Sequence, residues 1–143
     1  MRAPAPRSDL VPLADRLTVL AAVRLAMVAV VAATAVLAPG ATRGLDADVA
    51  LATVGFAAVT VVAEVGRRLM ARVRAITLVN VLLLVDGAWL AVVVHSTGGP
   101  DSALAFLLFL HVVAVTVLLS YRTGLKVTAW HTLLSFVVYF VSA

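Results

Sequence analysis

The sequence of 143 residues contains no cysteine and few charged side chains. Without cysteine the chain cannot form a disulfide, a thiolate metal site or a cysteine nucleophile. Charged residues make up 13% of the chain and hydrophobic residues 64%, and the mean hydropathy is +1.14. A water-soluble domain of this size cannot bury so much apolar surface, because a small globule leaves a large share of its chain exposed. The composition therefore predicts an integral membrane protein and excludes the ordinary soluble classes.

Short polar breaks divide the chain into apolar stretches that are long enough to cross about 30 Å of hydrocarbon. Proline or glycine marks most of these breaks, as in Pro39-Gly40 and Gly98-Gly99-Pro100. The pattern predicts an all-α fold, a polytopic transmembrane helix bundle with five helices. We expect an N-terminal cytoplasmic arm over residues 1–15 and a transmembrane domain over 16–143, with helices at about 17–38, 47–66, 74–95, 102–120 and 124–142.

The basic residues predict the orientation of this bundle. Nine of the eleven lie before the first stretch, between the second and third, or between the fourth and fifth. Because Lys and Arg are retained on the cytoplasmic side, the N-terminus is expected inside a multi-pass protein of the cytoplasmic membrane. Five crossings then bring the chain to the outer side, directly after an apolar run. We therefore expect the chain to be truncated before a sixth helix and a cytoplasmic output domain.

The net charge of +4 and the isoelectric point near 10.7 do not predict nucleic-acid binding. In a membrane chain, basic residues mainly report topology and contact with anionic headgroups. The expected partner is the lipid bilayer.

Three titratable residues, Asp86, His111 and His131, fall near the middle of the third, fourth and fifth stretches. Ionisable groups at this depth are costly and usually serve a function or a pairing. The fifth stretch adds Thr128 and Ser135 to the helix face of His131. We hypothesise a buried polar pocket in which Asp86 orients a histidine, so that the pocket responds to a proton or a ligand.

Other interpretations of these residues stay open. Asp86, His111 and His131 form a possible ligand set for a divalent metal, and the two histidines could hold a haem. No local motif supports either cofactor, so none is predicted. Interhelical hydrogen bonding alone is the simplest alternative.

Two further charged residues, Arg24 and Glu64, lie at similar depths in the first and second stretches. An ion pair between them is one expectation. Asp86 is another possible partner for Arg24, and each side chain could instead extend separately to the inner headgroups.

A specific pattern begins at Asp86 and continues through His95-Ser96-Thr97-Gly98-Gly99-Pro100-Asp101-Ser102-Ala103 to Ser120-Tyr121-Arg122-Thr123-Gly124-Leu125-Lys126. It resembles the N-terminal multi-pass sensor modules of bacterial signalling proteins, diguanylate cyclases of the GGDEF type and sensor histidine kinases. Within that group, the stretch from Ser120 to His131 is more similar to actinobacterial diguanylate cyclases than to histidine kinases. The loop motif is carried by Thr97, Gly98, Gly99 and Ser102, but Ala103 stands where the family often has proline.

The resemblance implies a module with six crossings that anchors, dimerises and receives a signal, such as a small ligand or lipid, for a cytoplasmic domain after Ala143. The segment itself carries no catalytic motif, so any enzymatic activity would belong to that output domain. A small proton- or ion-translocating protein and an assembly protein of the membrane are the alternatives.

The loop also has a physical interpretation of its own. Gly98 and Gly99 permit positive φ, and Asp101 or Ser102 can cap the helix that follows. A tight extracytoplasmic turn is therefore expected.

Overall fold

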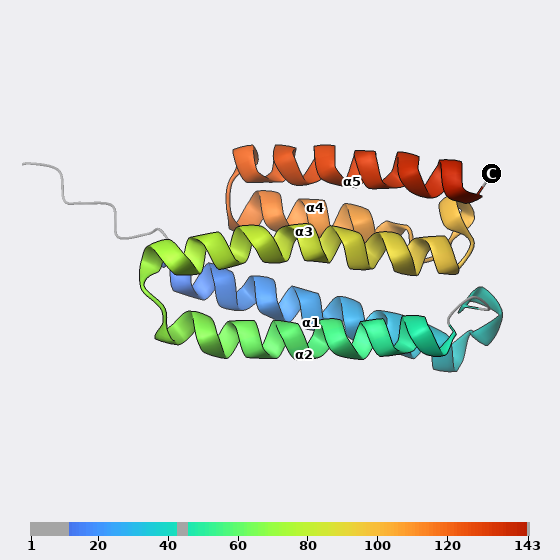
Figure 1. Cartoon of the computed structure of the whole chain (residues 1–143), viewed down its shortest axis with the longest axis horizontal. Coiled ribbons are helices and arrows are strands. Elements are labelled where there is room, and N and C mark those ends of the chain that lie inside the picture. The colour runs from blue at the N-terminus through green and yellow to red at the C-terminus, as the bar shows by residue number, and fades with distance from the viewer. Residues whose placement is uncertain (1–11, 43–45, 143) are drawn as a thin grey trace, which may run out of the picture.

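The computed structural model describes residues 12–42 and 46–142, and these form an all-α bundle (Figure 1). The predicted fold class is confirmed. The elements are α1 (Leu13–Leu37), the short 3-10 helix η1 (Pro39–Thr42), α2 (Ala47–Leu69), α3 (Arg72–Ser96), the short 3-10 helix η2 (Gly99–Asp101), α4 (Phe106–Leu118) and α5 (Tyr121–Ser142).

The five α-helices contact one another in a ring. α1 contacts α2, α2 contacts α3, α3 contacts α5, α5 contacts α4, and α4 contacts α1. In Figure 1, α3 lies between the pair α1 and α2 and the pair α4 and α5. It is the most buried of the membrane-length helices, with 44% of its most apolar window covered by protein. A residue at the middle of α3 is therefore held at the centre of the bundle.

Four of the helices are long and apolar enough to cross a membrane, namely α1, α2, α3 and α5. The expected fourth span, 102–120, is shorter than predicted, because α4 occupies only Phe106–Leu118. At about 1.5 Å per residue, its 13 residues cover roughly 20 Å. The turn at 102–105 and η2 provide the remaining length on that side.

Local hydrogen bonds explain why α4 starts late. Gly98 and Gly99 adopt positive φ, as predicted, and turn the chain directly after α3. The Ser102 hydroxyl oxygen then accepts from the Leu104 N–H and shares a hydrogen bond with the Thr97 hydroxyl. Ser102 therefore caps a tight turn, and regular α-helix begins only at Phe106.

The other helix boundaries differ from the predicted ones by a few residues. α1 begins at Leu13, immediately after Pro12, so the predicted arm is shorter at its inner end. The rest of the predicted arm, 1–11, lies outside the described residues. α5 begins at Tyr121, because the Ser120 hydroxyl oxygen accepts from the Thr123 N–H and satisfies a free donor of the first turn.

Two glycines allow α5 to approach its neighbours closely. A Cβ on Gly124 would lie 2.1 Å from Thr116 Oγ1, and one on Gly87 would lie 2.6 Å from the Trp130 ring. The Trp130 indole N–H also donates to the Leu84 carbonyl oxygen at 3.2 Å. Small residues at such crossings are a usual device of membrane bundles, where tight packing takes the place of the hydrophobic effect.

Replacing Gly124 with alanine should loosen the α4–α5 contact and destabilise the bundle by about 1–3 kcal/mol, the usual cost of an overpacked core. Gly55→Ala is the matched control, because a Cβ at Gly55 meets nothing within 4 Å. Reversible unfolding of both variants in lipid bicelles measures the difference. Equal stabilities would mean that α4 and α5 are not closely packed at this point.

Candidate functional site: a buried chain of arginine, aspartate and two histidines

Four polar side chains from four helices meet in the middle of the bundle. Arg24 of α1 donates from Nε to both carboxylate oxygens of Asp86 on α3, at 2.9 and 2.8 Å. Asp86 also contacts His111 of α4, whose Nε2 lies 3.1 Å from Oδ2 of Asp86. His111 Nδ1 in turn lies 2.9 Å from Nε2 of His131 on α5. We call these four residues the central chain.

The four side chains of the central chain are buried in the bundle. Asp86 and His111 are 0% exposed, Arg24 3% and His131 5%. In such a medium an isolated charge is very costly, so the carboxylate requires its cation. The guanidinium of Arg24 supplies that charge, with Nη2 also 2.8 Å from Oδ2. The two ions together make the buried charge of the chain close to zero.

The contacts also fix where the hydrogens lie. An ionised carboxylate can only accept, so Nε2 of His111 carries the hydrogen that points to Asp86. The Nδ1 of a neutral His111 is then an acceptor, and Nε2 of His131 must donate to it. For a neutral His131 this leaves Nδ1 as a bare acceptor, and this buried atom has no hydrogen-bond partner.

The sequence-predicted pocket residues occupy two different places. Asp86, His111 and His131 do meet, but Thr128 and Ser135 lie beside His131 on the exposed flank of α5. Their hydroxyls donate to carbonyl oxygens one turn earlier, of Gly124 and His131 respectively. These hydroxyls therefore border the central chain without joining it.

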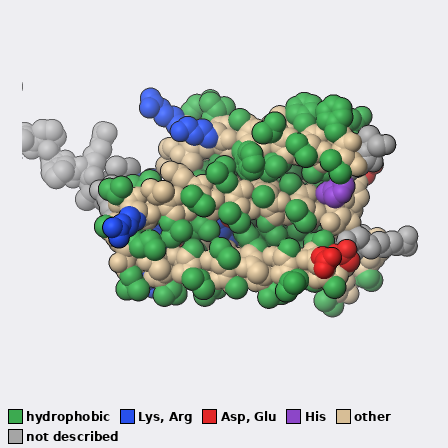
Figure 2. Space-filling model, in the orientation of Figure 1, with side chains coloured by type: hydrophobic (Ala, Val, Ile, Leu, Met, Phe, Trp, Pro, Cys, Tyr) green, Lys and Arg blue, Asp and Glu red, His purple; other side chains and the backbone are tan. Residues whose placement is uncertain are grey.

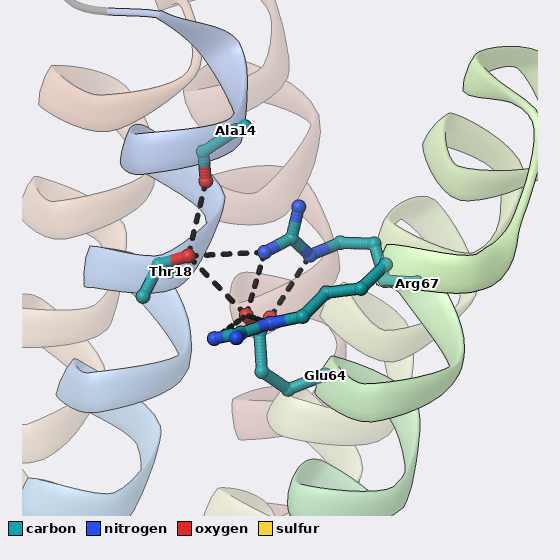
Figure 3. Close-up of polar contacts among 5 residues, drawn as sticks. Ala14, Thr18, Glu64 and Arg67 are labelled. Carbon is teal, nitrogen blue, oxygen red and sulfur yellow. Dashed lines mark hydrogen bonds and ion pairs between the residues drawn. The ribbon is translucent and has the colours of Figure 1, made fainter.

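The expected pair between Arg24 and Glu64 is wrong. Glu64 lies nearer the end of α2, where its carboxylate accepts from Arg67 at 2.6 and 2.9 Å and from Arg68 at 3.2 Å (Figure 3). Thr18 of α1 also contacts this carboxylate, since its hydroxyl lies 3.2 Å from Glu64. We call Thr18, Glu64, Arg67 and Arg68 the rim cluster. Partners three and four residues away on the same helix are reached more easily than a residue deeper in the bundle.

Basic side chains gather at the end of the bundle that holds the rim cluster (Figure 2). The described ones there come from the start of α1, the α2–α3 connection and the start of α5. The motif residues Thr97, Gly98, Gly99 and Ser102 lie at the opposite end, between α3 and α4. They build the turn described above and make no contact with the central chain.

A second buried polar contact was not expected from the sequence. The indole N–H of Trp89 on α3 donates to the Thr53 hydroxyl oxygen on α2 at 3.2 Å. The Trp89 ring stacks on Phe56 with centroids 4.3 Å apart. The shared helix face of Thr53 and Thr60 was the available signal, and both are buried. This contact links α3 to α2, the one long helix that contributes no residue to the central chain.

The geometry does not suit a cofactor at the histidines. His111 and His131 are bonded directly to each other, with no room for an iron between two nitrogens 2.9 Å apart. The Asp86 oxygens are occupied by Arg24 and His111. Within residues 12–42 and 46–142, no three His, Asp or Glu side chains are arranged as a metal site.

The chain matches a family of known proteins over most of its length. Residues 10–143 match the family described as the PilS-like transmembrane domain, whose designation specifies six transmembrane helices. No curated protein and no solved structure matches the chain.

The buried ion pair gives a stability prediction. Arg24→Met leaves the Asp86 carboxylate without its cation and should cost about 3–5 kcal/mol, as for other broken buried pairs. The double variant Arg24→Met, Asp86→Leu removes both charges and should recover most of that loss. Glu64→Gln at the rim should cost at most about 1 kcal/mol.

Thermal unfolding in nanodiscs, followed by helical circular dichroism, ranks the four proteins. A double variant no more stable than Arg24→Met would contradict the pairing.

Proposed function

Because the chain belongs to the family of PilS-like transmembrane domains, we propose that it is a sensory and anchoring module of the membrane. It receives a signal from the bilayer or from the outer side and regulates a cytoplasmic signalling domain that follows it. The segment itself is a multi-pass transmembrane domain, and its partner is the lipid bilayer.

The observation that carries this proposal is the central chain. It joins α1, α3, α4 and α5 through hydrogen bonds at a single depth. A change at His131 alters the hydrogen bond that its Nε2 donates to Nδ1 of His111. The hydrogen bond between Nε2 of His111 and Asp86 changes as a result. Because Asp86 holds Arg24, a local event on α5 is transmitted to α1. A network with two discrete arrangements is the physical element that such a switch requires.

The distribution of charge supports an orientation with the N-terminus in the cytoplasm. Apart from Arg24, the described Lys and Arg residues lie at the end where α1 begins and α2 ends (Figure 2). The family designation of six helices supports one further crossing after α5, which would return the chain to the basic side. That crossing would connect the bundle to the output domain.

Two output domains fit a module of this kind. The resemblance of the stretch from Ser120 to His131 to actinobacterial diguanylate cyclases favours a diguanylate cyclase over a histidine kinase. In either protein the bundle would act as a homodimer, because both output activities join two catalytic or substrate domains.

Proton translocation is the second candidate, because the central chain is a row of titratable groups. The fixed guanidinium of Arg24 at its end is unfavourable for a relay, since arginine does not release a proton in proteins.

The test uses the full-length protein in lipid vesicles. Asp86→Asn and His111→Gln should each change the basal output by at least about fivefold, the lower end of typical coupling between sites, because each weakens a link between α1 and α5. The product formed, cyclic diguanylate or a phosphohistidine, identifies the output domain.

His95→Gln is the matched control, since His95 is exposed at the end of α3 and lies outside the central chain. Unchanged output in folded Asp86→Asn and His111→Gln proteins would exclude the sensory role. Proton uptake by wild-type vesicles that is lost in Asp86→Asn would favour transport instead.

A further inference from the structure

A cavity of about 730 Å³ lies at the basic end of the bundle, between the start of α1 and the connection from α2 to α3. We call it the rim cavity. Because α1, α2 and α3 have membrane length, their ends lie where hydrocarbon meets lipid headgroups. The cavity has apolar walls that include the exposed side chains of Leu13, Met70 and Ile76. Its polar lining residues are Asp15, Thr18, Arg67 and Arg68.

Arg67 presents a fixed donor group to the rim cavity. Its Nε and Nη2 donate to the Glu64 carboxylate at 2.9 and 2.6 Å, and Nη2 also donates to the Thr18 hydroxyl oxygen at 3.0 Å. These contacts hold the guanidinium in one orientation. In Figure 3 the remaining nitrogen, Nη1, points away from Glu64, on the side of Ala14, which also lines the cavity. Nη1 makes no hydrogen bond with any described residue.

The charges around the rim cavity are of both signs. Arg67 and Arg68 share the single carboxylate of Glu64, so one positive charge is left without a counterion. Asp15 lines the same cavity, is exposed in the first turn of α1, and forms no ion pair with a described residue. The cavity therefore offers one free cation and one free carboxylate. Four other basic residues of this end do not line it, namely Arg16, Arg74, Arg122 and Lys126.

These groups specify the chemistry of a ligand. A phosphate suits the two N–H groups of Nη1, because guanidinium and phosphate match in geometry and in charge. Arg68 is 65% exposed and can reach the same phosphate. A carboxylate such as Asp15 is best satisfied by an ammonium that has N–H groups to donate. A ligand with one charge of each sign satisfies both partners, whereas a simple anion would leave Asp15 unpaired.

We propose that the rim cavity binds the headgroup of a phosphatidylethanolamine, a zwitterionic phospholipid with a primary ammonium. Its phosphate accepts from Nη1 of Arg67, and its ammonium donates to Asp15. The acyl chains pass over Leu13 and Ile76 into the bilayer. This inference goes beyond the proposed function, because it requires neither an output domain nor a response of the central chain. The bound lipid would join the ends of α1, α2 and α3.

The binding experiment uses the wild-type chain in detergent micelles, and native mass spectrometry counts the lipids that stay bound. Phosphatidylethanolamine, phosphatidylcholine and phosphatidylglycerol are compared, all with the same dioleoyl chains. Phosphatidylcholine has the same phosphate and the same net charge, but its ammonium has no N–H. We expect one phosphatidylethanolamine to bind about tenfold more tightly than either other lipid, as for one hydrogen bond to a charged group.

Two substitutions separate the two ends of the headgroup. Asp15→Asn removes the partner of the ammonium at an exposed position, so the preference for phosphatidylethanolamine over phosphatidylcholine should disappear. Arg67→Lys keeps the charge beside Glu64 but has no Nη1, so it should weaken both lipids about equally. Asp48→Asn is the matched control, because Asp48 is exposed in the first turn of α2 at the opposite end of the bundle. It should bind lipids as the wild type does.

Equal affinity of the wild-type chain for phosphatidylethanolamine and phosphatidylcholine would overturn the inference. Tighter binding of phosphatidylglycerol would also overturn it, in favour of a general attraction of the basic end for anionic lipids. Displacement of the lipid by an equal concentration of glycerophosphoethanolamine, which has no acyl chains, would replace the lipid with a soluble ligand. The wild-type comparison needs no variant, so it decides the question even if Arg67→Lys fails to fold.

Discussion

The ion pair between Arg24 and Asp86 is the constraint on which the rest of the bundle depends. A carboxylate at the centre of α3, fully buried, is tolerated only beside a cation, and Arg24 on α1 provides it. The pair fixes the rotation of both helices, because each side chain must face the other. His111 and His131 then extend the polar contacts to α4 and α5, which the tight approach at Gly124 holds together.

This arrangement leaves a polar interior beside an apolar flank. One end of the central chain is closed by a fixed positive charge, and the other ends at a nitrogen without a donor. Hydrogen bonding therefore has a direction, from His131 through His111 to Asp86. Under the proposed function, a change at His131 would alter the contact of His111 with Asp86, and through Asp86 the contact with α1. Such a coupling suits a domain that transmits a signal across helices without catalysing a reaction.

The depth of the polar residues in the membrane could be predicted from the sequence, but the rotation of each helix about its own axis could not. The apolar stretches place Asp86, His111 and His131 at the middle of their helices whatever the packing. Arg24 pairs with Asp86 and not with Glu64 because of the helix faces that contact each other. The sequence of a helix that is apolar on every side gives little indication of which face is buried. The sequence did hold a clue, since Glu64 has Arg67 and Arg68 within one turn. The late start of α4 depends on the side chains of Thr97 and Ser102, which propensity does not reveal.

The most direct test of this account is the position of the hydrogens on the two buried histidines. Nitrogen-15 NMR of the histidine-labelled protein in nanodiscs distinguishes protonated from bare ring nitrogens. We expect both His111 and His131 to be neutral with the hydrogen on Nε2, and the His111 signals to shift in Asp86→Asn. A hydrogen on Nδ1 of His111, or His111 signals unaffected by Asp86→Asn, would contradict the continuous chain from α5 to α1.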